Sequence, residues 1–198
     1  MSRLRIVLWV VGGCAAALIA FLAATIRVVE PGAADAQPAS LPVQPPPQVG
    51  LVDVPGLIVP VQGVRRNQLR SNWGEARGGG TRAHQGLDIM APANTPVIAA
   101  ADGRVEKLFY SNGGGGITLY QRSADGGWIY YYAHLAGYAP GIAEGRSLRA
   151  GDVLGYVGDT GNAGTGNYHL HFGVSRMAPN ERWHQGTPVD PYPLLVRR

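Results

Sequence analysis

Two residue types are almost missing from this chain of 198 residues, which contains one cysteine and one lysine. The single cysteine, Cys14, lies in an apolar N-terminal run, so the chain can form neither an internal disulfide nor a cysteine-rich structural zinc site. Clusters of basic residues with interleaved aromatic residues are missing as well. The net charge of +4 therefore does not indicate nucleic-acid binding, and we expect no nucleic-acid partner.

Long apolar stretches with helical periodicity are missing after residue 30. The chain instead contains short runs of β-forming residues, separated by turn signals such as Asp102-Gly103 and 125–127. The predicted strands are 96–100, 104–110, 117–122, 128–134, 153–157 and 169–176. This pattern predicts one all-β domain over residues 58–198, with an antiparallel sheet whose open face leaves room for an extended polymer.

The N-terminal segment has a different composition. An uncharged, mostly apolar run of 21 residues, Ile6 to Ile26, is preceded by Arg3 and Arg5 and followed by Arg27. A secretory signal typically has an apolar run of about 7–15 residues, whereas about 20 residues span a bilayer. We therefore expect residues 1–27 to form a transmembrane helix that acts as a signal anchor, with the N-terminus inside. The alternative is a signal peptide cleaved after the A-x-A-like sequence at residues 34–36.

A segment rich in proline, alanine and glutamine follows at residues 28–57, and it is almost uncharged. Such a segment cannot bury a core, so we interpret it as a linker. A Pro-rich linker extends by up to about 3.1 Å per residue, so this one could hold the domain up to roughly 90 Å from the membrane. The expected location is the inner membrane, with the β domain in the periplasm or outside, or a secreted form after cleavage.

Four of the five histidines lie in three short motifs: H-Q-G-L-D at 84–88, Y-A-H-L at 132–135 and H-L-H-F at 169–172. Alternate side chains of an extended strand share a face, so His84 would lie beside Asp88, and His169 beside His171. Imidazole and carboxylate groups are good zinc ligands, and catalytic zinc sites use three protein ligands and leave a fourth position for water. The spacing favours His84, Asp88 and His171 as these ligands.

Further motifs accompany the histidines in a fixed order: S-N-W-G-E-A-R-G-G-G-T-R-A-H-Q-G-L-D, A-P-A-N-T-P-V, Y-Y-A-H-L, G-Y-V-G-D-T-G-N-A and H-L-H-F-G-V. With these motifs the chain resembles, over roughly residues 58–198, the lysostaphin-like zinc metallopeptidases, the M23 endopeptidases of bacterial cell walls. The resemblance implies a two-sheet antiparallel β core of lysostaphin-like type (the duplicated hybrid motif), with loops walling an active-site groove. It also implies Zn²⁺ bound by His84, Asp88 and His171, with His134 and His169 as the catalytic pair that does not bind the metal.

Hydrolysis at such a site also requires groups that move protons. The H-E-x-x-H motif, whose glutamate is the base of many zinc peptidases, does not occur. An imidazole with a pKa of about 6.5 can accept a proton from water and donate one to a leaving amine. We therefore expect His134 and His169 to share this work, and either of them could be the general base.

Three further residues are predicted to contact the substrate. Arg77 and Arg82 flank the first motif and could bind an anionic group or lie in solvated loops. The tyrosines at 130–132 alternate across a predicted strand, so one or two of them should face the groove. Tyr131 is the one that we expect at the substrate, while His184 matches no motif and is expected in a surface loop.

The predicted function is a zinc-dependent endopeptidase that hydrolyses peptide cross-links of bacterial peptidoglycan during cell-wall remodelling. Two alternatives are a non-catalytic wall-binding regulator of other hydrolases and a general extracellular zinc protease. All five matched site positions are kept, which argues against the regulator. Many relatives carry glutamate where this chain has Gly173, although a subset carries glycine. A lipoyl- or biotin-carrier needs a lysine at a hairpin tip, whereas Lys107 lies within a predicted strand. The sequence leaves the cleaved bond, the oligomeric state and any protein regulators open.

Overall fold

The computed structural model describes residues 56–197, so the predicted signal anchor and nearly all of the predicted linker lie outside the described residues. No helix within residues 56–197 combines the length and apolarity needed to cross a membrane. The elements in chain order are η1 (Arg66–Gln68), β1 (Ala76–Arg77), β2 (Arg82–Ala83), β3 (Leu87–Met90), β4 (Pro96–Ile98), β5 (Gly103–Ser111), β6 (Gly116–Ser123), β7 (Trp128–Tyr138), β8 (Ser147–Leu148), β9 (Val153–Val157), β10 (His169–Arg176), β11 (Thr187–Val189) and α2 (Pro191–Val196).

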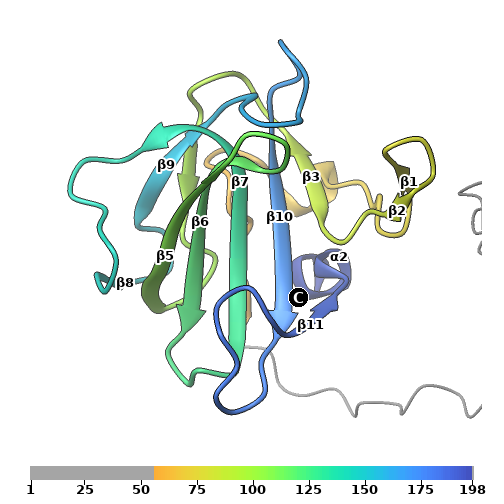
Figure 1. Ribbon diagram of the computed structural model, residues 1–198. Helices are drawn as coiled ribbons and strands as arrows, with labels where there is room; N and C mark the ends of the chain where they lie inside the picture. The colour runs from red at the N-terminus through yellow and green to blue at the C-terminus, as the bar shows by residue number, and fades with distance from the viewer. Residues whose placement is uncertain (1–55, 198) are drawn as a thin grey trace, which may run out of the picture. The chain divides into compact units, whose positions relative to one another are not determined.

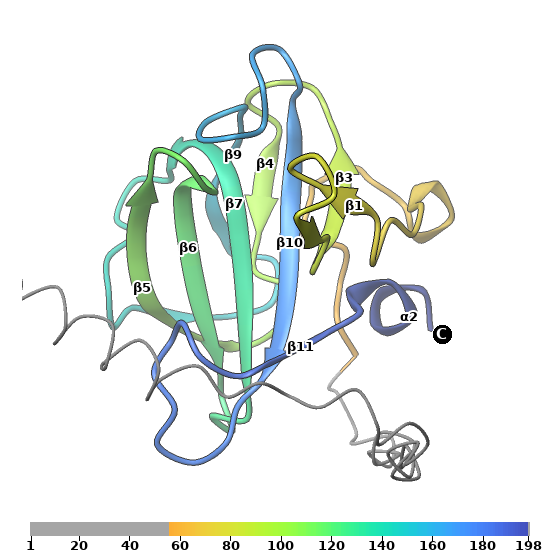
Figure 2. The ribbon, with the colours of Figure 1, turned by 45° about the vertical axis from the view of Figure 1, so that its right-hand side comes forward.

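The all-β, antiparallel class expected from the sequence is confirmed. Nine strands are hydrogen-bonded into one sheet along the order β11-β10-β7-β6-β5-β8, with β3 also paired to β10 and β9 joining β7 to β4. Strands β5, β6, β7 and β10 lie side by side (Figure 1), and β4 and β9 lie behind them (Figure 2). β1 and β2 form a separate hairpin.

The nine strands do not separate into the two sheets that the resemblance implies. The reason is β7, which is 11 residues long. Its first part, residues 128–133, pairs with β10, whereas residues 135–138 pair with β9. One long strand therefore belongs to both layers and makes the hydrogen bonding continuous between them.

The core lies between these layers and follows from period-2 alternation along the strands. On β10, Leu170, Phe172 and Val174 are at most 1% exposed, and each fully buried apolar side chain of this size contributes about 1.5–3 kcal/mol to stability. The alternate residues His169 and His171 consequently point to the other face of the strand. The packing that stabilises β10 thus also places its two histidines together.

The longer strands were predictable, and several of the shortest were not. β9 and β10 have the predicted bounds, and β7 continues four residues beyond its predicted end at His134. β1, β8 and β11 have only two or three residues, which is too short for alternation to be visible. The six-residue helix α2 begins where Asp190 caps it, its Oδ1 accepting from the backbone N–H of Tyr192 at 2.9 Å.

Candidate metal centre and active site

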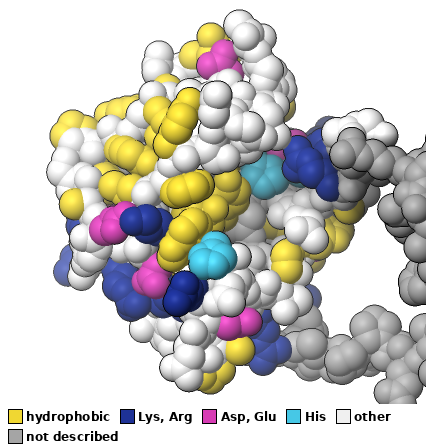
Figure 3. Space-filling view, viewed as in Figure 1, with side chains coloured by type: hydrophobic (Ala, Val, Ile, Leu, Met, Phe, Trp, Pro, Cys, Tyr) yellow, Lys and Arg dark blue, Asp and Glu magenta, His cyan; other side chains and the backbone are white. Residues whose placement is uncertain are grey.

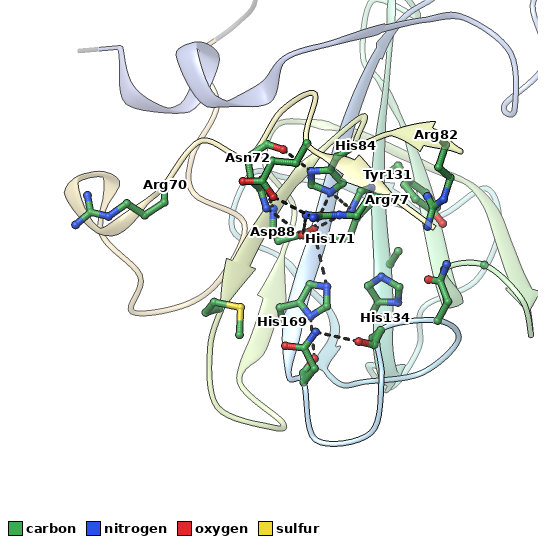
Figure 4. A pocket seen from close by; sticks show the side chains of 18 of the residues that line it. Arg70, Asn72, Arg77, Arg82, His84, Asp88, Tyr131, His134, His169 and His171 are labelled. Carbon is green, nitrogen blue, oxygen red and sulfur yellow. Dashed lines mark hydrogen bonds and ion pairs between the residues drawn. The ribbon is translucent and has the colours of Figure 1, made fainter. Parts of the chain in front are cut away.

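Three side chains meet in a geometry suited to one metal ion. The Nε2 atom of His84 lies 3.0 Å from Asp88 Oδ1 and 2.9 Å from His171 Nδ1, and these last two atoms are 3.0 Å apart. Figure 4 shows the three side chains converging. Tetrahedral Zn²⁺ with bonds of about 2.0–2.1 Å places neighbouring ligand atoms about 3.3 Å apart. The three atoms therefore approximate one face of a zinc tetrahedron, and the donor set fits Zn²⁺.

The sheet register brings two of these residues together. Asp88 on β3 lies directly opposite His171 on β10 in the antiparallel pairing, so their side chains are neighbours on one face. His84 follows β2 and is separated from β3 by a bend at Gly86. The prediction that residues 84–88 form one extended strand is therefore wrong. His84 reaches the site from the segment before the bend.

Gly86 leaves room for the ring of His171. A Cβ atom on Gly86 would lie 2.5 Å from His171 Cε1 and 2.6 Å from its Nε2. Any side chain here would displace the imidazole. The glycine inside H-Q-G-L-D is thus required by the candidate ligand His171 on β10.

Asn72 orients two of the three candidate ligands. Its carbonyl accepts from Nδ1–H of His84 at 2.9 Å, which orients the ring so that Nε2 faces Asp88 and His171. Its side chain donates to Asp88 Oδ2 at 3.0 Å and accepts from the Asp88 backbone N–H at 3.2 Å. Asn72 lies in the S-N-W-G motif, but the motif alone did not indicate this role.

Arg77, which we predicted to contact substrate, has its guanidinium engaged by two carboxylates. Nη2 lies 2.9 Å from Asp88 Oδ2 and Nη1 lies 2.9 Å from Glu75 Oε2. With Oδ2 held by Arg77 and Asn72, Oδ1 of Asp88 is the oxygen that faces the two histidines. The Arg77 side chain thus fixes which carboxylate oxygen is presented to a metal.

Two of the three candidate ligands have pKa values shifted toward the protonation states that metal binding needs. Burial tends to raise the pKa of Asp88, but the hydrogen bond and charge of His171, with the charges of His84 and His169, hold that pKa well below its usual range. Burial lowers the pKa of His171 despite the neighbouring carboxylate. An ionised carboxylate and a neutral imidazole are the forms that bind a cation.

His134 and His169 lie beside the three ligands, with ring centroids 4.8 Å apart (Figure 4). Nδ1 of His134 lies 2.8 Å from the carbonyl of Thr160, and Nδ1 of His169 lies 2.8 Å from the carbonyl of Asn167. A carbonyl only accepts, so each Nδ1 carries a hydrogen and each Nε2 is the ring nitrogen left for proton transfer. Burial lowers the pKa of His134 to about 4. At neutral pH His134 is therefore an uncharged proton acceptor.

A β-bulge turns His134 toward the cavity. Ile117 pairs with Leu135 and Leu119 with Tyr132, so Thr118 faces two residues of β7, one of which is His134. His134 has φ 62°, an unusual value for a residue other than glycine. Strict alternation would have put His134 on the core face with Tyr132. The bulge reverses its direction, as bulges beside active sites often do.

The five residues line one cavity of 620 Å³, together with Tyr131 and Arg82. Tyr130 and Tyr132 are fully buried in the core, so Tyr131 is the tyrosine of the triplet that faces the cavity. Asn162 Oδ1, in the amide orientation that satisfies its surroundings, accepts from Arg82 at 3.1 Å. All eight residues singled out from the sequence thus meet at this cavity.

Residues 82–191 match the family described as Peptidase family M23. A Bacillus subtilis protein named L-Ala--D-Glu endopeptidase is 39% identical over 135 residues, which are 64% of this chain and 39% of that protein. A Vibrio cholerae protein named peptidoglycan DD-endopeptidase ShyC is 33% identical over 104 residues, 52% of this chain and 23% of that protein. The solved catalytic domain of lysostaphin from Staphylococcus simulans has a TM-score of 0.55 and 29% identity, covering 67% of this chain and 96% of that domain. The chain spans less than half the length of the curated relatives it matches.

Proposed function

Because the chain belongs to peptidase family M23, we propose that it is a zinc-dependent endopeptidase that hydrolyses peptide cross-links of bacterial peptidoglycan. The observation that carries this proposal is the placement of three ligand atoms, 2.9–3.0 Å apart, beside two histidines with free Nε2 atoms. The substrate is supported by relatives whose names specify peptidoglycan or cell-wall peptide bonds.

The proposed ligands are His84 Nε2, Asp88 Oδ1 and His171 Nδ1. Zn²⁺ at this position would lower the pKa of a water molecule in its fourth coordination position to about 7 and polarise a peptide carbonyl. The side chains of the protein provide the proton transfers. One Nε2 atom of the His134–His169 pair accepts a proton of the attacking water. The imidazolium formed in this way then donates that proton to the leaving amine, and a protonated ring of the pair can also stabilise the developing oxyanion.

The shape of the site favours an extended peptide over a folded protein. The ligands lie on the face of a sheet and are walled by the segments at 70–82 and 162–167. A single extended chain can lie along this cavity, whereas a folded globule cannot bring its backbone within the roughly 3 Å needed for attack. Cross-linked stem peptides meet this requirement.

We expect the purified full-length chain with zinc to release monomers from purified sacculi by cutting cross-linked dimers, while the glycan strands stay intact and casein is comparatively untouched. Chromatography and mass spectrometry of the products check this result and identify the cleaved bond. Removal of zinc with a chelator is the control. Efficient digestion of casein without release of monomers from sacculi would contradict the proposal and favour a general extracellular zinc protease.

We further propose that the chain is held at the inner membrane by residues 1–27, with its catalytic domain in the periplasm. The support is the 21-residue apolar run and its basic flank. Residues 28–57 would then act as a spacer that lets the catalytic site reach the wall.

This topology predicts that the full-length chain sediments with membranes and resists extraction by salt but not by detergent. External protease should remove the β domain from spheroplasts. A shortened, freely soluble protein that begins near Gln37 would contradict the anchor and indicate a cleaved signal peptide.

A further inference from the structure

A second cavity of 390 Å³ adjoins the proposed active site. Arg82, Tyr131 and His171 line both cavities, so the two cavities meet at these side chains. The volume lies within the range of about 300–1,000 Å³ found for small-ligand sites. A substrate that occupies the first cavity can therefore extend directly into the second.

A continuous row of aromatic side chains leads from the metal centre into this cavity. The ring centroids of His171 and Tyr131 are 5.8 Å apart, those of Tyr131 and Tyr120 4.6 Å, and those of Tyr120 and Trp183 4.5 Å. Phe109 follows at 5.4 Å from Trp183 and is 42% exposed. Figure 3 shows hydrophobic side chains gathered over β5, β6 and β7, next to histidine side chains on this face. We call these five residues the aromatic row.

The loop that carries Trp183 is held in place before any ligand binds. Arg122 donates to the carbonyl of Glu181 at 3.2 Å, and Gln185 accepts from the backbone N–H of Arg182 at 2.7 Å. Gly186 has φ 96°, and a Cβ there would lie 2.6 Å from Met177 Sδ. A side chain presented by such an anchored loop loses little conformational entropy on binding.

The polar lining of the second cavity suits a neutral ligand with many hydroxyl or amide groups. Gln85, Ser175 and Gln185 provide neutral donors and acceptors. Among the described residues that line it, none is acidic and Arg82 is the only one with a permanent charge. Gly173 contributes no side chain to this wall.

We propose that the second cavity is a sugar subsite, in which an N-acetylated hexose of the glycan strand stacks on Trp183 and contacts Tyr120, whose ring lies at 62° to that of Trp183. A pyranose ring presents polarised C–H groups on its face, which complement the negative π-face of an aromatic ring. Its hydroxyl and acetamido groups match the neutral polar residues at the rim. This inference rests on the proposed function, because it assumes a stem peptide that is still attached to its sugar.

The first test measures binding without catalysis. The full-length chain is titrated with a tetramer of N-acetylglucosamine while tryptophan fluorescence is recorded, since Trp183 is one of four tryptophans. We expect a saturable change that disappears in Trp183→Phe, which removes the reporter. Absence of a saturable change in the wild type, or its persistence in Trp183→Phe, would overturn the assignment.

The second test compares two substrates that differ only in their sugar. One is a cross-linked muropeptide dimer carrying its disaccharides, and the other is the same dimer freed of sugar by an amidase. We expect Trp183→Ala to lower kcat/KM on the first roughly 3- to 10-fold, the usual effect of one aromatic stacking partner. The same variant should cleave the sugar-free peptide within about twofold of the wild-type rate, and Trp183→Phe should retain most of the preference.

Tyr110→Ala is the matched control, because Tyr110 is an exposed aromatic residue of β5 that lines neither cavity. It should behave as the wild type on both substrates. Equal effects of Trp183→Ala on the two substrates, or no effect on either, would overturn the sugar subsite while the endopeptidase function stands. Failure of the wild type to cleave either substrate would overturn the proposed function and this inference with it.

Discussion

Replacement of Asp88 by alanine is expected to reduce bound zinc from about one ion per chain to less than roughly a fifth, because two imidazoles alone do not hold the ion. Hydrolysis of peptidoglycan should fall at least about a thousandfold, since the metal supplies several kcal/mol of transition-state stabilisation. His84→Ala and His171→Ala should have the same effect. Elemental analysis of the dialysed full-length chain measures the zinc, and release of muropeptides measures the rate.

A control for these variants is Asp152→Ala. The Asp152 side chain accepts from the backbone N–H of Arg149 at 2.9 Å in a turn and lines neither cavity, so zinc content and rate should be unchanged. Circular dichroism should show the same strand content in all four variants. Full zinc occupancy in Asp88→Ala would show that the ligand assignment is wrong.

The second large effect separates proton transfer from metal binding. His134→Asn and His169→Ala should keep about one zinc per chain and lose roughly 10²- to 10⁴-fold in kcat, the usual contribution of a positioned acid or base. Asparagine is chosen at residue 134 because it tolerates the positive φ of that position. A loss of activity in His134→Asn can then be attributed to the imidazole and not to backbone strain.

The two histidines of β10 provide an internal check. His169 and His171 share one face of the strand, and only His171 reaches the other two ligand atoms within 3.0 Å, whereas His169 Nε2 lies 3.8 Å from Asp88 Oδ1. If His169→Ala emptied the site while His171→Ala retained zinc, the two roles would be reversed.

The sequence predicted the long strands, and it singled out residues that the structure brings to one cavity, because both depend on residue type. Alternation along β10 is visible as H-L-H-F-G-V, and it places two histidines on one face. The direction of His134 was not visible in the same way. Alternation along β7 assigns it to the core, and only the bulge opposite Thr118 corrects this.

The supporting contacts were harder to predict, because many of them use the backbone. Asn72 and Thr160 each hold a histidine through a main-chain carbonyl, and any residue type could supply a carbonyl. Arg77 and Trp183 illustrate a different limit. Both residue types can be read from the sequence. Their contacts with Asp88 and Tyr120 depend on the conformation of loops, which no local sequence pattern predicts.

The two glycine-rich segments at residues 113–116 and 160–166 contact each other, and this contact limits how the enzyme can be re-engineered. The Gly115 carbonyl accepts from the backbone N–H of His134 at 2.7 Å, and the Thr160 carbonyl accepts from its ring. Added Cβ atoms would drive Gly116 into Thr160 and Gly161 into Gly114, so each segment is shaped to the other. The two segments are more than 40 residues apart in sequence, but their residues must change together. A chimera that exchanges one of them with a relative must exchange both, or the donor loop will clash and the histidine between them will lose its alignment.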